Sequence, residues 1–68
     1  MNETKNEIIA ELDGNISDEQ LKLIKSLLDE EKYRMAFLEL SKIKESSEVK
    51  VSQKYLNLLE KFWWEYAN

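Results

Sequence analysis

The feature that most limits what this chain can fold into is that its 68 residues include no cysteine and no histidine. Disulfide scaffolds, zinc fingers and iron–sulfur sites all need these side chains, so neither a crosslink nor such a metal centre can stabilise the domain. Proline is also absent, and the single glycine is Gly14. We therefore expect one domain, residues 1–68, that depends on dense helix packing or on a partner and has a stability of about 3–5 kcal/mol.

Capping signals and apolar spacing predict four helices. Thr4-x-x-Glu7 and Ser17-x-x-Gln20 match the capping box, Ser52 is a candidate cap, and Gly14 is typical of a helix end. Apolar side chains recur three and four residues apart between these signals. The predicted helices cover residues 5–13, 18–30, 32–44 and 53–66, with a loop at 45–51 in which Val49 and Val51 suggest a short extended stretch.

The boundary between the second and third helices is the least defined, because no helix breaker lies between Leu28 and Tyr33. The two could form one helix of about 28 residues, which would measure about 42 Å. Such a helix would leave much apolar surface uncovered in so small a protein, so we favour a break near residues 29–32. The predicted fold is all-α, a compact bundle of four short helices. Its predicted core is Ile8, Leu12, Ile24, Leu28, Phe37, Leu40, Leu59, Phe62 and Trp63.

The two neighbouring tryptophans near the C-terminus fall on different sides of the last helix. At 100° per residue, Trp63 joins the apolar arc, whereas Trp64 falls between Glu60 and Asn57 on the polar side. A large ring there is either packed against another helix or exposed for a partner.

Charge is unevenly distributed along the chain. Residues 1–31 carry nine acids and three bases, net −6, and residues 32–68 carry five acids and seven bases, net +2. The acidic half is either a solvated surface or a surface that attracts a basic partner. The candidate partner-binding residues are Asp13, Asp18, Glu19, Asp29, Glu30, Glu31 and Trp64.

The sequence predicts no catalytic residue, no metal site and no cofactor. Carboxylate pairs such as Glu7 and Glu11 do acid–base chemistry only in a cleft that separates their pKa values, and a helical domain of this size has little room for one. Calcium loops and phosphate loops need a glycine spacing that is absent here. The chain is therefore expected not to be an enzyme.

The sequence also argues against nucleic-acid and membrane partners. The best basic set is interspersed with acids, in a domain that is acidic as a whole. This set is Lys42, Lys44, Lys50 and Lys54. The polar, acidic N-terminus lacks the features of a signal peptide, and no apolar stretch approaches the ~20 residues of a membrane span, so a cytoplasmic location is expected.

Three stretches resemble the MafI family of small bacterial immunity proteins. They are a capped helix start with acids, an acidic turn followed by an aromatic residue and a leucine-rich helix, and a capped last helix. These are residues Ile16–Leu21, Glu31–Leu40 and Val51–Leu56. The chain departs from the family at Glu30-Glu31-Lys32, where the family tends to have a glycine and an acid, and in its aromatic cluster at residues 62–66.

The resemblance implies a short all-helical protein that binds a cognate toxin, commonly a nuclease, and that has no catalytic residues of its own. The leading hypothesis is therefore an immunity protein that occludes the toxin's active site or substrate surface. Two alternatives remain: a helical adaptor or regulator that acts by homodimerisation through the last helix or by binding a partner helix, and a small DNA-binding regulator.

Overall fold

Four α-helices and a final π-helical turn make up the computed structural model, which describes residues 3–46 and 51–68. The helices are α1 (Glu3–Leu12), α2 (Asp18–Asp29), α3 (Tyr33–Glu45) and α4 (Gln53–Phe62), and the π-helix η1 (Trp63–Ala67) continues α4. The described residues contain no strand. The prediction of an all-α bundle of four short helices is confirmed. The expected extended stretch at Val49 lies outside the described residues.

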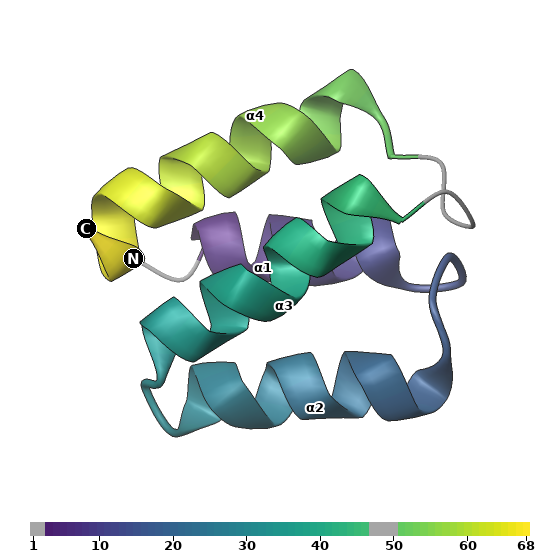
Figure 1. The fold of residues 1–68 in the computed structure, drawn as a ribbon, viewed down its shortest axis with the longest axis horizontal. Coiled ribbons are helices and arrows are strands. Elements are labelled where there is room, and N and C mark those ends of the chain that lie inside the picture. Colours follow the sequence, from purple (N-terminus) through teal and green to yellow (C-terminus); the bar gives the residue numbers. More distant parts are fainter. Residues whose placement is uncertain (1–2, 47–50) are drawn as a thin grey trace.

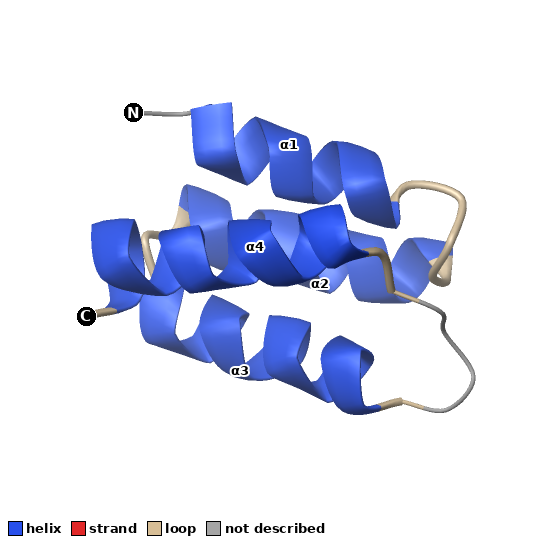
Figure 2. Cartoon of the chain, turned by 90° about the horizontal axis from the view of Figure 1, so that it is seen from above, coloured by secondary structure: helices blue, strands red, loops and turns tan. Residues whose placement is uncertain are grey.

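Each helix contacts the next, and α4 returns to α1, so the four form a closed ring around one core (Figure 1). The molecule measures 28 × 24 × 18 Å along its principal axes. Figures 1 and 2 agree that the α1–α2 turn lies at one end of the bundle. The α2–α3 turn, η1 and the start of α1 lie at the other end.

Two helices begin at the serine caps that the sequence predicts. The Gln20 backbone N–H donates to the Ser17 hydroxyl oxygen at 3.1 Å, and the Tyr55 N–H donates to that of Ser52 at 3.0 Å. Each bond satisfies one of the backbone donors that the first turn of a helix leaves free.

The predicted cap at Thr4 is wrong. Because α1 already begins at Glu3, Thr4 lies inside the helix, where it is 2% exposed. Its hydroxyl donates to Oε1 of Glu65 at 2.6 Å, across to η1. The Thr4 hydroxyl therefore bonds to a residue distant in sequence, and not to the backbone of its own helix as the capping pattern predicted.

Both turns that flank α2 use a residue in the left-handed region. Gly14 has φ 84°, and the N–H of Asn15 donates to the Leu12 carbonyl at 2.8 Å, which ends α1. Glu31 has φ 59° at the end of α2. Here the N–H groups of Glu31 and Lys32 donate to the carbonyls of Leu28 at 3.2 Å and Leu27 at 2.9 Å. This is the Schellman pattern, and it confirms the predicted break between the second and third helices.

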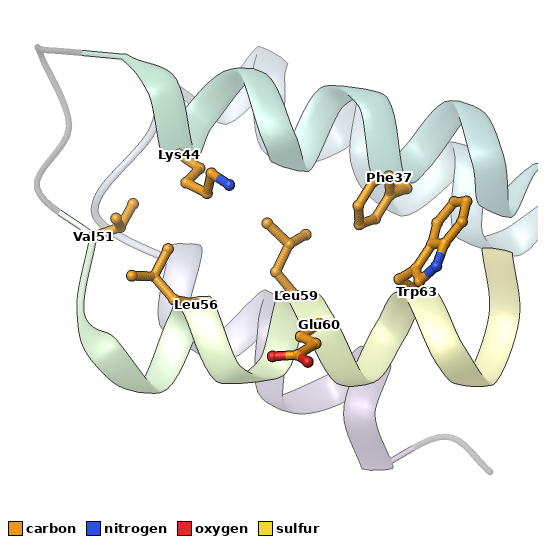
Figure 3. Close-up of a pocket in the computed structure, with 7 residues that line it drawn as sticks. All are labelled: Phe37, Lys44, Val51, Leu56, Leu59, Glu60 and Trp63. Atoms are coloured by element: carbon orange, nitrogen blue, oxygen red, sulfur yellow. The ribbon is translucent and has the colours of Figure 1, made fainter. Parts of the chain in front are cut away.

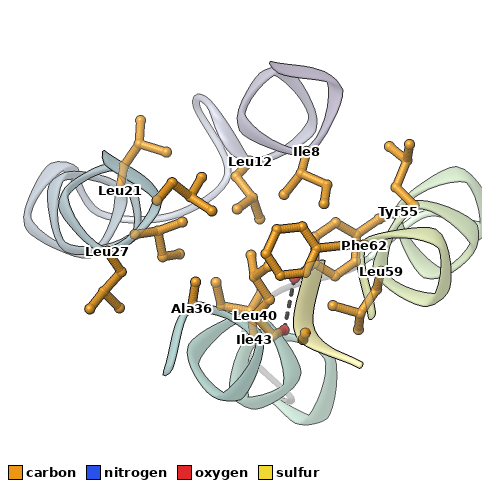
Figure 4. Packing of buried hydrophobic residues seen from close by; sticks show 14 residues of the cluster. Ile8, Leu12, Leu21, Leu27, Ala36, Leu40, Ile43, Tyr55, Leu59 and Phe62 are labelled. Carbon is orange, nitrogen blue, oxygen red and sulfur yellow. Dashed lines mark hydrogen bonds between the residues drawn. The ribbon is translucent and has the colours of Figure 1, made fainter. Parts of the chain in front are cut away.

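The core confirms seven of the nine predicted side chains. Those seven are Ile8, Leu12, Ile24, Leu28, Leu40, Leu59 and Phe62. The prediction that Phe37 and Trp63 lie in the core is wrong, because both side chains are only half-buried. Helix α3 turns Ala36, Leu40 and Ile43 inward instead (Figure 4), which leaves Phe37 on its flank.

Tyr55 lies at the centre of the core and was not among the residues predicted to be there. It is 2% exposed, and its hydroxyl donates to the Leu40 carbonyl at 2.8 Å, which joins α4 to α3 (Figure 4). Burial raises the pKa of the Tyr55 hydroxyl well above its usual value of 10. The Tyr55 hydroxyl therefore stays neutral in the core, where one buried hydrogen bond satisfies it.

The end of the last helix differs from the regular α-helix expected through Tyr66. After Phe62 the chain widens into η1, whose closing bond runs from the Asn68 N–H to the Trp63 carbonyl at 2.7 Å. A π-helix turns less per residue than an α-helix, so Ala67 comes round to the core side, where it is 1% exposed. In addition, α4 buries Leu58, which shifts its inward face away from Trp63.

Candidate functional site

The six candidate acids are all exposed, but they form two separate sets. Asp13 lies in the α1–α2 turn, and Asp18 and Glu19 open α2. The other set, residues 29–31, closes the same helix. Because α2 has 12 residues, its ends are about 18 Å apart, beyond the ~8 Å reach of charges at physiological salt. The structure therefore does not bring these acids together into one patch.

The acids at the end of α2 are mixed with bases. The Lys32 Nζ lies 3.7 Å from an Oε of Glu30, with both side chains more than half exposed. Lys5, Lys25 and Asp29 line a shallow hollow between α1 and α2. Exposed pairs of this kind add only about 0–1 kcal/mol to stability, but they reduce the local negative field.

The acids at the start of α2 form no ion pair, although Lys22 lies one helical turn beyond Asp18 and Glu19. Within the described part of the chain, no ion pair involves Asp13, Asp18 or Glu19. Nearby Glu11 is paired, with Lys54 at 3.5 Å. We call Asp13, Asp18 and Glu19 the acidic end. All three of its carboxylates are exposed, so a partner can reach them.

The C-terminal turn η1, which contains Trp64, lies at the opposite end of the bundle from the α1–α2 turn and the start of α2 (Figure 1). The Trp64 side chain is 63% exposed, so the interpretation that it packs against another helix is wrong. Trp64 follows Trp63 and lies one helical turn beyond Glu60. Its exposure places a large apolar ring where a partner can reach it.

An apolar groove of about 520 Å³ runs between α3 and α4 and reaches Trp63, the first residue of η1. Phe37 and Trp63 close one end of it, with ring centroids 4.9 Å apart, and Lys44 and Val51 lie at the other end (Figure 3). The remaining lining residues come from α4: Leu56, Leu59 and Glu60. We call this the α3–α4 groove.

A second groove, of about 290 Å³, lies between α2 and α3. Leu23, Met35 and Leu38 line it and are 45%, 53% and 61% exposed. The ion pair between Lys42 and Glu39, at 2.9 Å, lies on its margin. We call this the α2–α3 groove.

Neither groove was predicted from the sequence, although one signal was present. Residues 35–38 are four consecutive apolar residues, which span the whole circumference of a helix. They cannot all face one core, so some had to lie at the surface. The sequence could not say which, because that depends on how α3 is rotated about its axis.

The end of the bundle near Trp64 also holds a polar and aromatic cluster. The Lys5 ammonium lies over the rings of Tyr33 and Tyr66, at 5.5 and 5.4 Å from their centroids. The Nε of Arg34 donates to the Ala67 carbonyl at 3.1 Å. Together with the bond from Thr4 to Glu65, these contacts hold η1 against α1 and α3.

Three further observations limit what the described surface can hold. No group of three or more acidic, cysteine or histidine side chains within it is placed to bind a metal ion. Of the basic set, Lys42 and Lys54 are engaged by Glu39 and Glu11, and Lys50 lies outside the described residues. No helix in the described ranges is long and apolar enough to cross a membrane.

Comparisons with family models, with curated proteins and with solved structures find no match. The resemblance to the MafI family therefore stays a prediction, and the candidate site rests on the charges and the shape of this chain alone.

Proposed function

We propose that this chain is a protein-binding domain that acts as an immunity protein: it neutralises a cognate toxin by covering the toxin's active site or substrate surface. The observation that carries the proposal is the acidic end, where Asp13, Asp18 and Glu19 are exposed and no ion pair engages them within the described residues.

A nuclease toxin would supply the complementary surface, because an enzyme that binds a polyanion presents clustered lysine and arginine side chains. Carboxylates on a rigid turn and helix start can occupy such a surface in place of phosphates. Complementary charges of this kind act mainly on the rate of association. The protein would act in the cytoplasm of the cell that makes it, where the toxin's substrate lies.

Two variants of equal charge test the proposal. Asp13→Asn/Asp18→Asn/Glu19→Gln removes the acidic end, and Asp29→Asn/Glu30→Gln/Glu31→Gln is the matched control at the other end of α2. The partner to test first is the product of the gene adjacent to the one that encodes this chain. We expect the first variant to slow association at least about tenfold and to flatten its salt dependence, and the control to change it much less.

The proposal is overturned if the two variants behave alike, or if the neighbouring gene product does not bind. Circular dichroism must show that both variants remain folded, because Asp18 and Glu19 also interact with the dipole of α2, at about 0.3–1 kcal/mol each.

The alternative function, a helical adaptor, is favoured by the α2–α3 groove. Leu23, Met35 and Leu38 are exposed at helical spacings on two neighbouring helices, which suits the apolar face of a partner helix. In this case Leu38→Glu would abolish partner binding while the loss of the acidic end would leave it unchanged. The same binding assay thus separates the two functions.

A further inference from the structure

The α3–α4 groove is an apolar hollow that the proposed function leaves unexplained. Its volume of about 520 Å³ falls within the range of sites that bury a small ligand. Four large apolar side chains of its wall are only half-buried, although each packs against the core: Phe37, Val51, Leu56 and Trp63. A molecule that covers these side chains removes apolar surface from water, which favours binding.

The two helices set the length of the groove. On α3 its lining residues run from Phe37 to Lys44, and on α4 they run from Leu56 to Trp63. Both pairs are seven positions apart in the sequence, so each wall is about 10 Å long at ~1.5 Å per residue. The aromatic pair of Phe37 and Trp63 closes one end (Figure 3). A straight apolar chain of medium length therefore fits along the side chains of Leu56 and Leu59.

The other end of the groove carries a cation. Figure 3 shows the Lys44 ammonium turned toward the middle of the groove, and no ion pair engages it within the described residues. The acid in the lining, Glu60, has a side chain that runs along α4 and not toward α3 (Figure 3). A ligand with a negative head at the Lys44 end and an apolar tail toward the two rings therefore complements the whole groove.

We propose that the α3–α4 groove binds a free fatty carboxylate of medium chain length, such as octanoate. The carboxylate of the ligand pairs with the Lys44 ammonium, and the methyl end of its chain meets the rings of Phe37 and Trp63. This inference does not rest on toxin binding, because the groove is formed by α3, α4 and η1, whereas the acidic end belongs to the α1–α2 turn and to α2.

The α2–α3 groove is an internal comparison that shows why charge favours the other groove. It too has apolar walls and a lysine, but the Lys42 ammonium lies 2.9 Å from a carboxylate oxygen of Glu39. A carboxylate ligand at Lys42 would therefore meet a negative charge already in place, whereas Lys44 offers its ammonium without such a partner among the described ion pairs. We expect the ligand to select the α3–α4 groove.

Titration with octanoate, followed by two-dimensional amide NMR spectra, tests the proposal. The open groove predicts weak binding, with a dissociation constant in the range of about 0.2–2 mM. The amide signals of α3 and α4 along the groove should shift together, whereas those of Leu23 and Leu38 in the α2–α3 groove should not. Hexanoate, which is two methylene groups shorter, should bind about four- to fifteenfold more weakly, because each buried methylene group adds to the affinity.

Two variants of equal charge separate the two lysines. Lys44→Met keeps the apolar stem of the side chain and removes its ammonium, so it should weaken octanoate binding about three- to fivefold, the upper part of the range for an exposed ion pair. Lys42→Met is the matched control on the same helix, and it should leave the dissociation constant within about 1.5-fold of the wild type. Octylammonium, which has the same tail and the opposite charge, should bind at least about threefold more weakly than octanoate.

Four outcomes overturn the proposal. They are groove signals that do not shift at octanoate concentrations well above the expected dissociation constant, shifts confined to the α2–α3 groove, equal effects of Lys44→Met and Lys42→Met, and octylammonium binding as tight as that of octanoate. The variant Asp13→Asn/Asp18→Asn/Glu19→Gln should bind octanoate like the wild type, so a failure of toxin binding and a failure of ligand binding can be told apart.

Discussion

Glu31 is the described residue whose backbone conformation least suits its side chain. Its φ of 59° is the left-handed conformation that closes many helices and that glycine adopts without steric cost. For other residues this conformation costs about 1–2 kcal/mol. The turn forms nevertheless, because it satisfies two carbonyls of α2 and directs the chain into α3.

Glu31→Gly should therefore raise the free energy of unfolding, by about 0.5–1 kcal/mol, because relief of the strain exceeds the entropy that glycine adds to the unfolded chain. Urea denaturation measures the change. Glu31→Ala is the control, since it removes the charge but keeps a Cβ in the left-handed region, and it should give little gain. A loss of stability in the glycine variant would contradict this account.

At the scale of elements, η1 depends on contacts made far from it in sequence. Thr4 of α1 donates to Glu65, Arg34 of α3 donates to the Ala67 carbonyl, and Lys5 lies over Tyr66. A π-helical turn is rare, and its hydrogen bonds alone do not favour it over an α-helix. These three contacts stabilise the π-helical turn relative to an α-helical one, because the wider turn lets Glu65 reach Thr4 and the Ala67 carbonyl reach Arg34.

Thr4→Val tests this dependence, because valine keeps the shape of the buried side chain and removes only the hydroxyl. We expect the free energy of unfolding to fall by about 1.5–3 kcal/mol, the usual range for a hydrogen bond to a charged acceptor. A double-mutant cycle with Glu65→Ala should assign most of that loss to the pair. If the free-energy losses of Thr4→Val and Glu65→Ala simply add in the double variant, the hydrogen bond between these residues does not hold η1 in place.

At the scale of the whole molecule, one small core is shared by all four helices. Leu40 of α3 is 0% exposed and belongs to this core, whereas Phe37, on the same helix, lies in the wall of the α3–α4 groove. The larger side chain therefore contributes less to the core than the smaller one. This arrangement contradicts the prediction that Phe37 lies in the core.

Leu40→Ala should lower the free energy of unfolding by about 2–5 kcal/mol, which approaches the whole stability expected of a domain this small. Phe37→Ala should cost less, because its ring is already half in solvent, and the variant should keep a cooperative thermal transition by circular dichroism. Equal losses in the two variants would mean that the groove wall is part of the core in solution.

Charge is also arranged at the scale of the molecule. The net −6 of residues 1–31 is a property of the sequence, but α2 separates its acids into two sets about 18 Å apart. One set includes an ion pair, between Glu30 and Lys32, and a hollow that Asp29 shares with two lysines, whereas no ion pair involves the other set in the described residues. The candidate partner surface is consequently smaller than the six acids predicted from sequence, and it lies away from Trp64.

The sequence by itself determined the features that depend on near neighbours in the chain. The caps at Ser17 and Ser52, the turn at Gly14 and the break after α2 are all made by hydrogen bonds that span a few residues. The exposure of the six acids follows as directly, because unpaired charges remain in water. The spacing of apolar residues likewise determined that four helices would surround one core.

Only the tertiary structure decided how each helix is rotated and what its side chains meet. Ala36 rather than Phe37 faces the core, Thr4 bonds to Glu65 rather than capping α1, and Ala67 is buried by the change from α- to π-helix. The grooves beside α3 arise in the same way. Each of these outcomes depends on the packing of all four helices at once, because the rotation that best fills the core leaves different side chains at the margins, and no single helix carries that information.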